Sequence, residues 1–195
     1  MAVKNFMTRG NQKLAKNILC WSITPIVSCI NCKNCAKDCY AMKAYNQYPN
    51  VKKAWDRNLM YSHSADFMPY IIGQLKRSQT AKTVRIHVAG DFHSDNYIRR
   101  WGAIVKMFPT IKFYAYTKVF ALFKDELNEL DSLPNCNIIN SIAFDGGNIY
   151  GDDTRIEKLV SAGYYLCPAV KGADVICGKD CSYCITGKLP CFKQH

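Results

Sequence analysis

Eleven cysteines in a chain of 195 residues are the feature of this sequence most able to carry chemistry. They fall largely into two groups, Cys29, Cys32, Cys35 and Cys39, and Cys167, Cys177, Cys181, Cys184 and Cys191. The N-terminus is basic and polar and lacks the apolar stretch of a secretory signal, so we expect a cytoplasmic protein. Cytoplasmic thiols stay reduced, and grouped cysteines there indicate metal binding or catalysis before disulfides.

The first group has the spacing C-x2-C-x2-C-x3-C. Structural zinc sites usually draw on two well separated cysteine pairs. Four thiols packed so closely are instead typical of the loop that wraps an iron–sulfur cube. Tyr40 stands where a bacterial ferredoxin has proline, so we expect a [4Fe–4S] cluster but not a ferredoxin. The expected ligands are Cys29, Cys32, Cys35 and Cys39.

The second group contains a C-x3-C-x2-C triplet, Cys177, Cys181 and Cys184, with an aromatic residue before the last cysteine. In radical enzymes such a triplet leaves one iron open to S-adenosylmethionine, but there it follows the first strand of a barrel. Here the triplet lies near the end of the chain. With Cys167 as a fourth ligand it predicts a second, closed [4Fe–4S] cluster, and a zinc site on the same four cysteines is the alternative.

Four further polar residues are candidates for a catalytic role. Asp91 either binds a ligand amine or hydroxyl, or caps the helix that follows it. His93 follows a Gly-Asp-Phe turn, and Lys118 is suited to hold a carboxylate or a phosphate. Tyr40 is either a radical relay, a stacking surface or a core residue.

The chain is strongly basic, with a formal net charge of +11. Residues 1–60 carry ten lysines and arginines against two aspartates. This distribution either suits nucleic acid or a phosphorylated substrate, or is simply a solvated basic face. No apolar run approaches the roughly 18–20 residues that span a bilayer, so no membrane partner is expected.

The elements that must position these residues alternate between strand and helix. We expect strands at 23–28, 83–89, 111–117, 137–144 and 164–167, and helices at 51–78, 95–107, 121–133 and 154–162. Ser94 is the expected N-cap of the second helix, and Gly163 the C-cap of the last. Strand–helix–strand units of this length predict a parallel sheet with right-handed crossovers.

Five strands are too few for a closed eight-stranded barrel. We therefore expect one α/β domain over 1–195, an open partial (β/α) barrel of about five mainly parallel strands with two cysteine-rich metal-binding loops. Its parts are the first cysteine loop and a helix (22–50), the βα repeats (83–167) and a cysteine-rich C-terminal segment (167–195). Ligands collect at the carboxyl ends of parallel strands, so both cysteine groups are expected at that rim.

Several motifs in this order resemble the phage gene-product-88 family. They are Gly10–Leu14, the loop that closes on Cys39-Tyr40-Ala41, Val84–Phe92 with Tyr97 and Trp101, Phe113–Lys118, Cys167-Pro168, the cysteine triplet and Phe192–His195. The resemblance implies a protein encoded by a phage or mobile element and working in the host cytoplasm. It implies no particular reaction.

The resemblance also bears on the ligands. The family's first loop falls on Cys29, Cys35 and Cys39 and leaves Cys32 as either a fourth ligand or a bystander. The central strands are similar to part of a radical S-adenosylmethionine barrel. In that superfamily the position of Gly90 and Asp91 presents backbone to the methionine amine, which implies a cofactor-binding role here.

Three functions remain open from the sequence. The first is a small enzyme with two [4Fe–4S] clusters, radical-S-adenosylmethionine-like or another oxidoreductase, which acts on a phosphorylated or nucleic-acid-related substrate. It would take electrons from a donor such as ferredoxin or flavodoxin. The second is a nucleic-acid-binding module stabilised by zinc or an iron–sulfur cluster, without catalysis. The third is an electron carrier with closed clusters.

Overall fold

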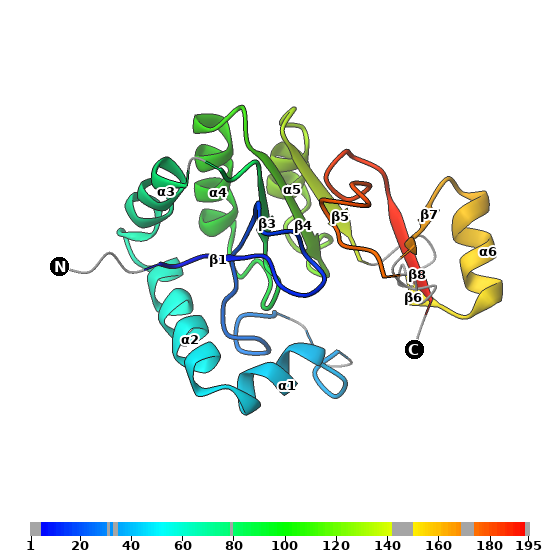
Figure 1. The fold of residues 1–195 in the computed structure, drawn as a ribbon, viewed down its shortest axis with the longest axis horizontal. Coiled ribbons are helices and arrows are strands. Elements are labelled where there is room, and N and C mark those ends of the chain that lie inside the picture. The colour runs from blue at the N-terminus through cyan, green and yellow to red at the C-terminus, as the bar shows by residue number, and fades with distance from the viewer. Residues whose placement is uncertain are drawn as a thin grey trace.

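A five-stranded, mostly parallel sheet forms the centre of the computed structural model (Figure 1). The structure describes residues 5–30, 32, 35–78, 80–141, 150–168 and 174–193. The strands lie side by side in chain order, and the first is antiparallel to the second. They are β1 (Thr8–Arg9), β2 (Ile18–Cys20), β3 (Thr83–Ile86), β4 (Lys112–Thr117) and β5 (Cys136–Asn140). The prediction of about five mainly parallel strands in an open α/β fold is therefore confirmed, and the barrel is not closed.

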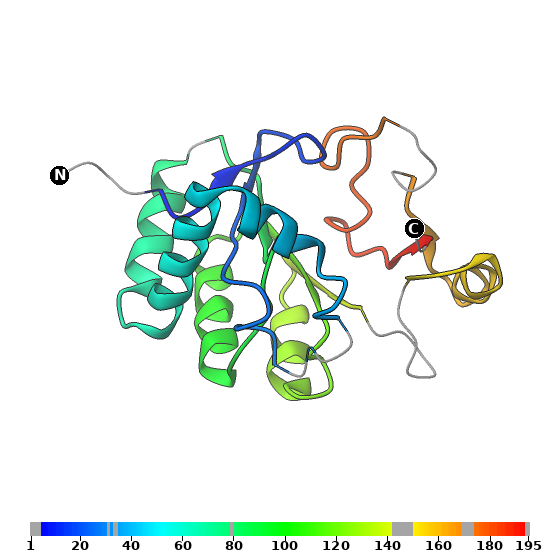
Figure 2. The same ribbon diagram turned by 90° about the horizontal axis from the view of Figure 1, so that it is seen from below.

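Six helices are defined within the described ranges. They are α1 (Tyr40–Gln47), α2 (Pro49–His63), α3 (Phe67–Arg77), α4 (Asp95–Met107), α5 (Lys124–Asp131) and α6 (Asp153–Ser161). Helices α3, α4 and α5 stand in a row along one face of the sheet (Figures 1 and 2). The predicted α4 is confirmed, including its N-cap, because Ser94 Oγ accepts a hydrogen bond from Tyr97 N at 3.2 Å.

Two expected elements are wrong. The strand at 23–28 is a turn, in which Val27 N donates to Pro25 O, and the strand beside β3 lies earlier, at Ile18–Cys20. Proline has no N–H to offer a strand ladder, which favours the turn. The helix expected at 51–78 is two helices, because α2 ends at His63 and α3 begins at Phe67. The end of the third expected strand, 142–144, lies outside the described residues.

The last expected strand belongs to a second sheet. Tyr165–Leu166 is β7, which pairs with β8 (Pro190–Lys193), and β8 pairs in turn with β6 (Tyr150–Gly151). Its partner β8 follows the cysteine-rich segment and was not foreseen from the sequence. The C-cap of α6 is Ala162, one residue before the predicted Gly163, and Gly163 follows it with a φ of +90°, the left-handed conformation in which many helices end.

The central sheet is covered on both faces because its side chains alternate. The face toward the helices presents Val84, Ile86, Phe113, Ala115 and Ile138 to the main core. The opposite face presents Arg85, Tyr114, Tyr116, Asn137 and Ile139 to the C-terminal segment. Arg85, Tyr114 and Asn137 stand in one row across β3, β4 and β5. The cysteine-rich segment therefore packs on a sheet face that carries a polar row.

None of the helices in the described ranges is long and apolar enough to cross a membrane.

Gly90 marks a close contact between the end of β3 and the turn after β2. Its φ is +84°, and a Cβ there would lie 2.4 Å from Ile23 Cγ1 and 2.7 Å from Ser28 Oγ. We expect Gly90→Ala to lower the free energy of unfolding by about 2 kcal/mol, from backbone strain and overlap. Gly102→Ala in α4 is the control, because nothing lies within 4 Å of its Cβ position. Urea denaturation should show Gly102→Ala unchanged or more stable by up to about 1 kcal/mol, and equal effects at both positions would contradict this reading.

Candidate metal centre

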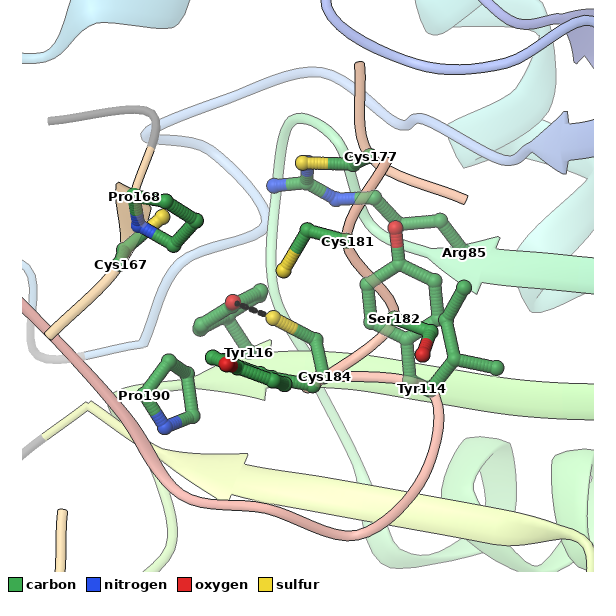
Figure 3. Close-up of a pocket in the computed structure, with 12 residues that line it drawn as sticks. Arg85, Tyr114, Tyr116, Cys167, Pro168, Cys177, Cys181, Ser182, Cys184 and Pro190 are labelled. Carbon is green, nitrogen blue, oxygen red and sulfur yellow. Dashed lines mark hydrogen bonds between the residues drawn. The ribbon is translucent and has the colours of Figure 1, made fainter. Parts of the chain in front are cut away.

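Four cysteines of the second group line the same cavity in the described part of the chain (Figure 3). They are Cys167, Cys177, Cys181 and Cys184. The cavity measures about 40 Å³, whereas a single water needs about 10–15 Å³. Arg85, Tyr114 and Tyr116 from the central sheet form its other wall. The tertiary structure thus brings together cysteines up to seventeen positions apart, which are the four predicted as one ligand set.

Backbone hydrogen bonds hold each part of this cysteine cavity. Cys177 N donates to Lys13 O at 3.0 Å and Cys177 O accepts from Ala15 N at 2.9 Å, which fixes the triplet beside β2. Cys167 N donates to Cys191 O at 2.8 Å between β7 and β8. Asn137 Nδ2 on β5 donates to Cys184 O at 2.7 Å. The cavity therefore joins the central sheet to the second sheet.

Tyr116 contacts one of the candidate ligands directly. Its hydroxyl lies 2.7 Å from Cys184 Sγ (Figure 3). Burial raises the pKa of the Cys184 thiol to about 11, although the hydrogen bond between Cys184 and Tyr116 acts in the opposite direction. Cys184 is therefore a protonated thiol at neutral pH in the absence of metal, and a bound cation would have to displace that proton.

Arg85 brings a positive charge to the same cavity. Its guanidinium carbon lies 5.4 Å from the ring centroid of Tyr116 and 5.9 Å from that of Tyr114. Sequence reasoning did not single it out. A signal was present, because Arg85 is the charged residue of an otherwise apolar strand, Val84-Arg85-Ile86, that a sheet was expected to bury.

The first group lies at the carboxyl end of the sheet, as expected. Cys29 N donates to Ile26 O at 3.1 Å in the turn after β2, and Cys39 directly precedes α1. Tyr40 donates a hydrogen bond from its hydroxyl to Val88 O. Cys29, Cys35 and Cys39 all lie within electrostatic reach of that hydroxyl.

Cys32 makes a hydrogen bond within the first cysteine loop. Its Sγ donates to Ile26 O at 3.7 Å. Burial raises the pKa of Cys29 to about 12, and the nearby Asp91 and Cys32 add to that rise. Residues 31, 33 and 34 of this loop lie outside the described residues. Among the residues that are described, no three side chains of His, Cys, Asp or Glu meet closely enough to hold one metal ion.

The expectation that both groups share the carboxyl rim is wrong for the second group. Cys167 follows β7, which belongs to the second sheet, and Cys177 pairs with Leu14 beside β2. The cysteine cavity consequently lies over the face of the central sheet, against Tyr114 and Tyr116. The positions of strand ends in the sequence could not reveal that the cavity lies over the sheet face, because β7 was expected to extend the central sheet.

Asp91 ties two strand ends together. Its Oδ1 accepts from Thr117 Oγ1 and Phe92 N at 2.8 Å, and its Oδ2 accepts from Lys118 N at 2.9 Å. Burial raises the pKa of Asp91 to about 6, although these hydrogen bonds lower it. The Lys118 side chain points to solvent. These contacts satisfy the carboxylate of the buried Asp91, and a cofactor-binding role for Gly90 and Asp91 stays a prediction.

His93 is held in a stack of rings. Its Nε2 lies 2.9 Å from Ser62 Oγ, and its ring stacks on His63 and Tyr97 at centroid distances of 4.2 and 4.3 Å. Burial lowers the pKa of His93 to about 4, and His63 and Arg100 lower it further. Packing accounts for the ring and for Nε2, whereas His93 Nδ1 is buried without a hydrogen-bond partner among the described residues.

The lowered pKa of His93 predicts a loss of stability in acid. The unfolded chain, with an ordinary imidazole, takes up a proton before the folded chain does. The contribution is therefore complete above about pH 6.5 and is lost as pH falls toward 4, and for this partly exposed ring we expect a loss of about 1–2 kcal/mol. We expect His93→Gln to flatten the pH dependence of the free energy of unfolding over this range, measured by urea denaturation. His63→Gln, at an exposed position, is the control and should keep most of the slope, and an unflattened His93→Gln profile would contradict the assignment.

Comparison with known proteins agrees with the sequence resemblance. Residues 5–155 match the profile of a family described as Gene product 88. The "Gene 88 protein" of Mycobacterium phage L5 and that of Mycobacterium phage D29 are each 30% identical to this chain over 95 residues. The match covers 44% of this chain and 40% of each relative, so these relatives are aligned over less than half of their length. No solved structure matches the fold.

Proposed function

The chain belongs to the Gene product 88 family, and we propose that it is an iron–sulfur redox protein with two [4Fe–4S] clusters. The observation that carries this proposal is the cysteine cavity, in which Cys167, Cys177, Cys181 and Cys184 surround one space. Four thiolates are the usual ligand set of a [4Fe–4S] cluster. Such a cluster supplies one-electron transfer when bound.

The four cysteines of the cavity are a donor set that fits a [4Fe–4S] cluster, in which each thiolate binds a different iron. A single zinc ion would instead draw all four sulfurs to one point, at about 2.3 Å from each. Cysteine sulfur suits both groups, so zinc is the alternative that metal analysis tests.

Metal analysis of anaerobically purified protein tests the proposal. We expect about eight irons and eight acid-labile sulfides per chain, which is the content of two cubes. Cys184→Ala and Cys39→Ala should each lose about half of this iron, because each removes a ligand of a different cluster. Cys136→Ala is the matched control, since Cys136 packs against the main core and does not line the cavity. Zinc in place of iron, or full iron content in both ligand variants, would refute the proposal.

In this proposal the first cluster is bound by three cysteines, Cys29, Cys35 and Cys39, and not by Cys32. Support comes from Cys32, whose Sγ already donates a hydrogen bond to Ile26 O at 3.7 Å. Three ligands leave one iron of a cube without a protein thiolate. That position would be open to S-adenosylmethionine or to a substrate, and the enzyme would draw its electrons from a ferredoxin or flavodoxin.

Paired substitutions test this ligand set. We expect Cys32→Ala to keep the iron content of the wild type and Cys35→Ala to lose about half of it. Loss of iron in both variants would assign Cys32 as a fourth ligand and close the cluster. With three ligands, reduced protein should bind S-adenosylmethionine in equilibrium dialysis. Failure to bind it or to cleave it to 5′-deoxyadenosine would leave the electron-carrier function in place of the radical one.

A second candidate function is nucleic-acid binding by a metal-stabilised fold. It is favoured by the net charge of +11 and by a hollow next to the triplet that Lys16 and Lys179 help to line. Phosphate contacts of this kind would give an affinity that falls steeply with rising salt. Absence of binding to DNA and RNA at low salt would remove this candidate.

A further inference from the structure

Arg85 occupies the wall of the cysteine cavity that the central sheet supplies. It stands next to Tyr114 in the row across the sheet, and its guanidinium lies near the faces of Tyr114 and Tyr116. Figure 3 shows its side chain reaching along the cavity toward Cys177. The two tyrosine rings hold the cation in place without neutralising its charge.

The described residues give Arg85 no acidic partner. The four ion pairs among them, Lys52–Asp56, Arg99–Asp95, Arg99–Glu126 and Lys106–Glu129, all involve other residues. Arg85 Nε is buried and has no hydrogen-bond partner in this part of the chain. Arg85 is half-buried, and of its guanidinium atoms Nε is shut off from solvent. A partly desolvated cation without a neighbouring anion carries a local cost that an anion in the cavity would offset.

The cavity itself can supply that anion. Arg85 lines the same cavity as Cys177 and Cys184. Both cysteines belong to the ligand set proposed above. When metal displaces the thiol protons, the thiolates place negative charge directly opposite the guanidinium. No acidic side chain of the described residues competes for that place.

We infer that Arg85 is the fixed counter-charge of the cluster in the cysteine cavity and that it raises the reduction potential of that cluster. The inference rests on the proposed function. Four thiolates make the bound cluster an anion, and reduction by one electron from an external donor adds one more negative charge. A fixed positive charge stabilises the reduced form more than the oxidised form, because net charge is one of the factors that set such potentials. Arg85 binds no iron itself, and it acts on the reduction potential only through its charge beside the cluster.

A redox titration followed by electron paramagnetic resonance, with dithionite as the reductant, tests the inference. The titration is made in the Cys39→Ala background, so that the cavity cluster alone contributes. We expect Arg85→Gln to weaken reduction at least tenfold, which is a shift of about 59 mV to lower potential for one electron. Arg85→Lys keeps the charge and should shift the potential much less. Lys106→Gln removes one positive charge from an exposed side chain and should leave the potential unchanged.

The outcomes separate the inference from the proposal beneath it. Wild-type protein without iron overturns the proposed function. Iron retained in Arg85→Gln with an unchanged potential overturns the inference alone. A shift of equal size in Lys106→Gln also overturns it, because the effect would then follow overall charge and not the position of Arg85.

A variant that loses its cluster has no reduction potential to titrate. For that case, thermal unfolding with and without metal tests the inference. No carboxylate lines the cavity, so without the cluster the guanidinium has no anionic partner there. Metal-free Arg85→Met should then be at least as stable as metal-free wild type. A much lower melting temperature would assign Arg85 a packing role on the tyrosines and overturn the inference. Inorganic phosphate that stabilises the metal-free wild type but not Arg85→Met would also overturn it, in favour of a free anion as the partner.

Discussion

The arrangement of the whole molecule depends on how the second face of the parallel sheet is covered. Parallel sheets are usually buried on both faces, because their backbone and side chains need partners on each side. Helices α3, α4 and α5 cover one face with a continuous apolar core. The other face is covered by a cysteine-rich segment of mostly irregular structure, held by two smaller apolar clusters. A metal bound there would add to folding stability directly, since its ligands come from segments that regular structure does not fix.

A row of polar side chains lies on the sheet face that the cysteine-rich segment covers. Arg85, Tyr114 and Asn137 stand side by side on neighbouring strands, where a parallel sheet would ordinarily present apolar side chains. Asn137 is satisfied by the backbone of Cys184, and Tyr116 by its thiol. The guanidinium is left without a protein anion among the described residues. Each of these polar groups points to the segment that carries the cysteines, so that segment and the sheet specify one another.

At the carboxyl rim of the sheet, hydrogen bonds and a close backbone contact hold the strand ends together. There Asp91 accepts hydrogen bonds from the end of β4, and Gly90 allows the turn after β2 to come close. The first cysteine group follows that turn. Tyr40 fastens the end of the first cysteine loop to the sheet, because its hydroxyl donates a hydrogen bond to Val88 O beyond β3.

The sequence by itself determined the local elements and the ligand candidates. The period of apolar residues located α4, β-rich runs of residues located β3 and β4, and the grouping of cysteines identified the residues that surround the cavity. These signals are local, because they arise from helix period, residue composition and the spacing of thiols along the chain.

Tertiary structure alone decided where those local pieces meet. The turn around Pro25 had the composition of a strand, and β7 joined a second sheet because its partner, β8, lies beyond the cysteine triplet. The choice between extending one sheet and starting another depends on a pairing partner distant in sequence, which no local pattern encodes. The same holds for Arg85, whose charge could be read from the chain. That it would face four thiols followed only when the C-terminal segment was laid against the sheet.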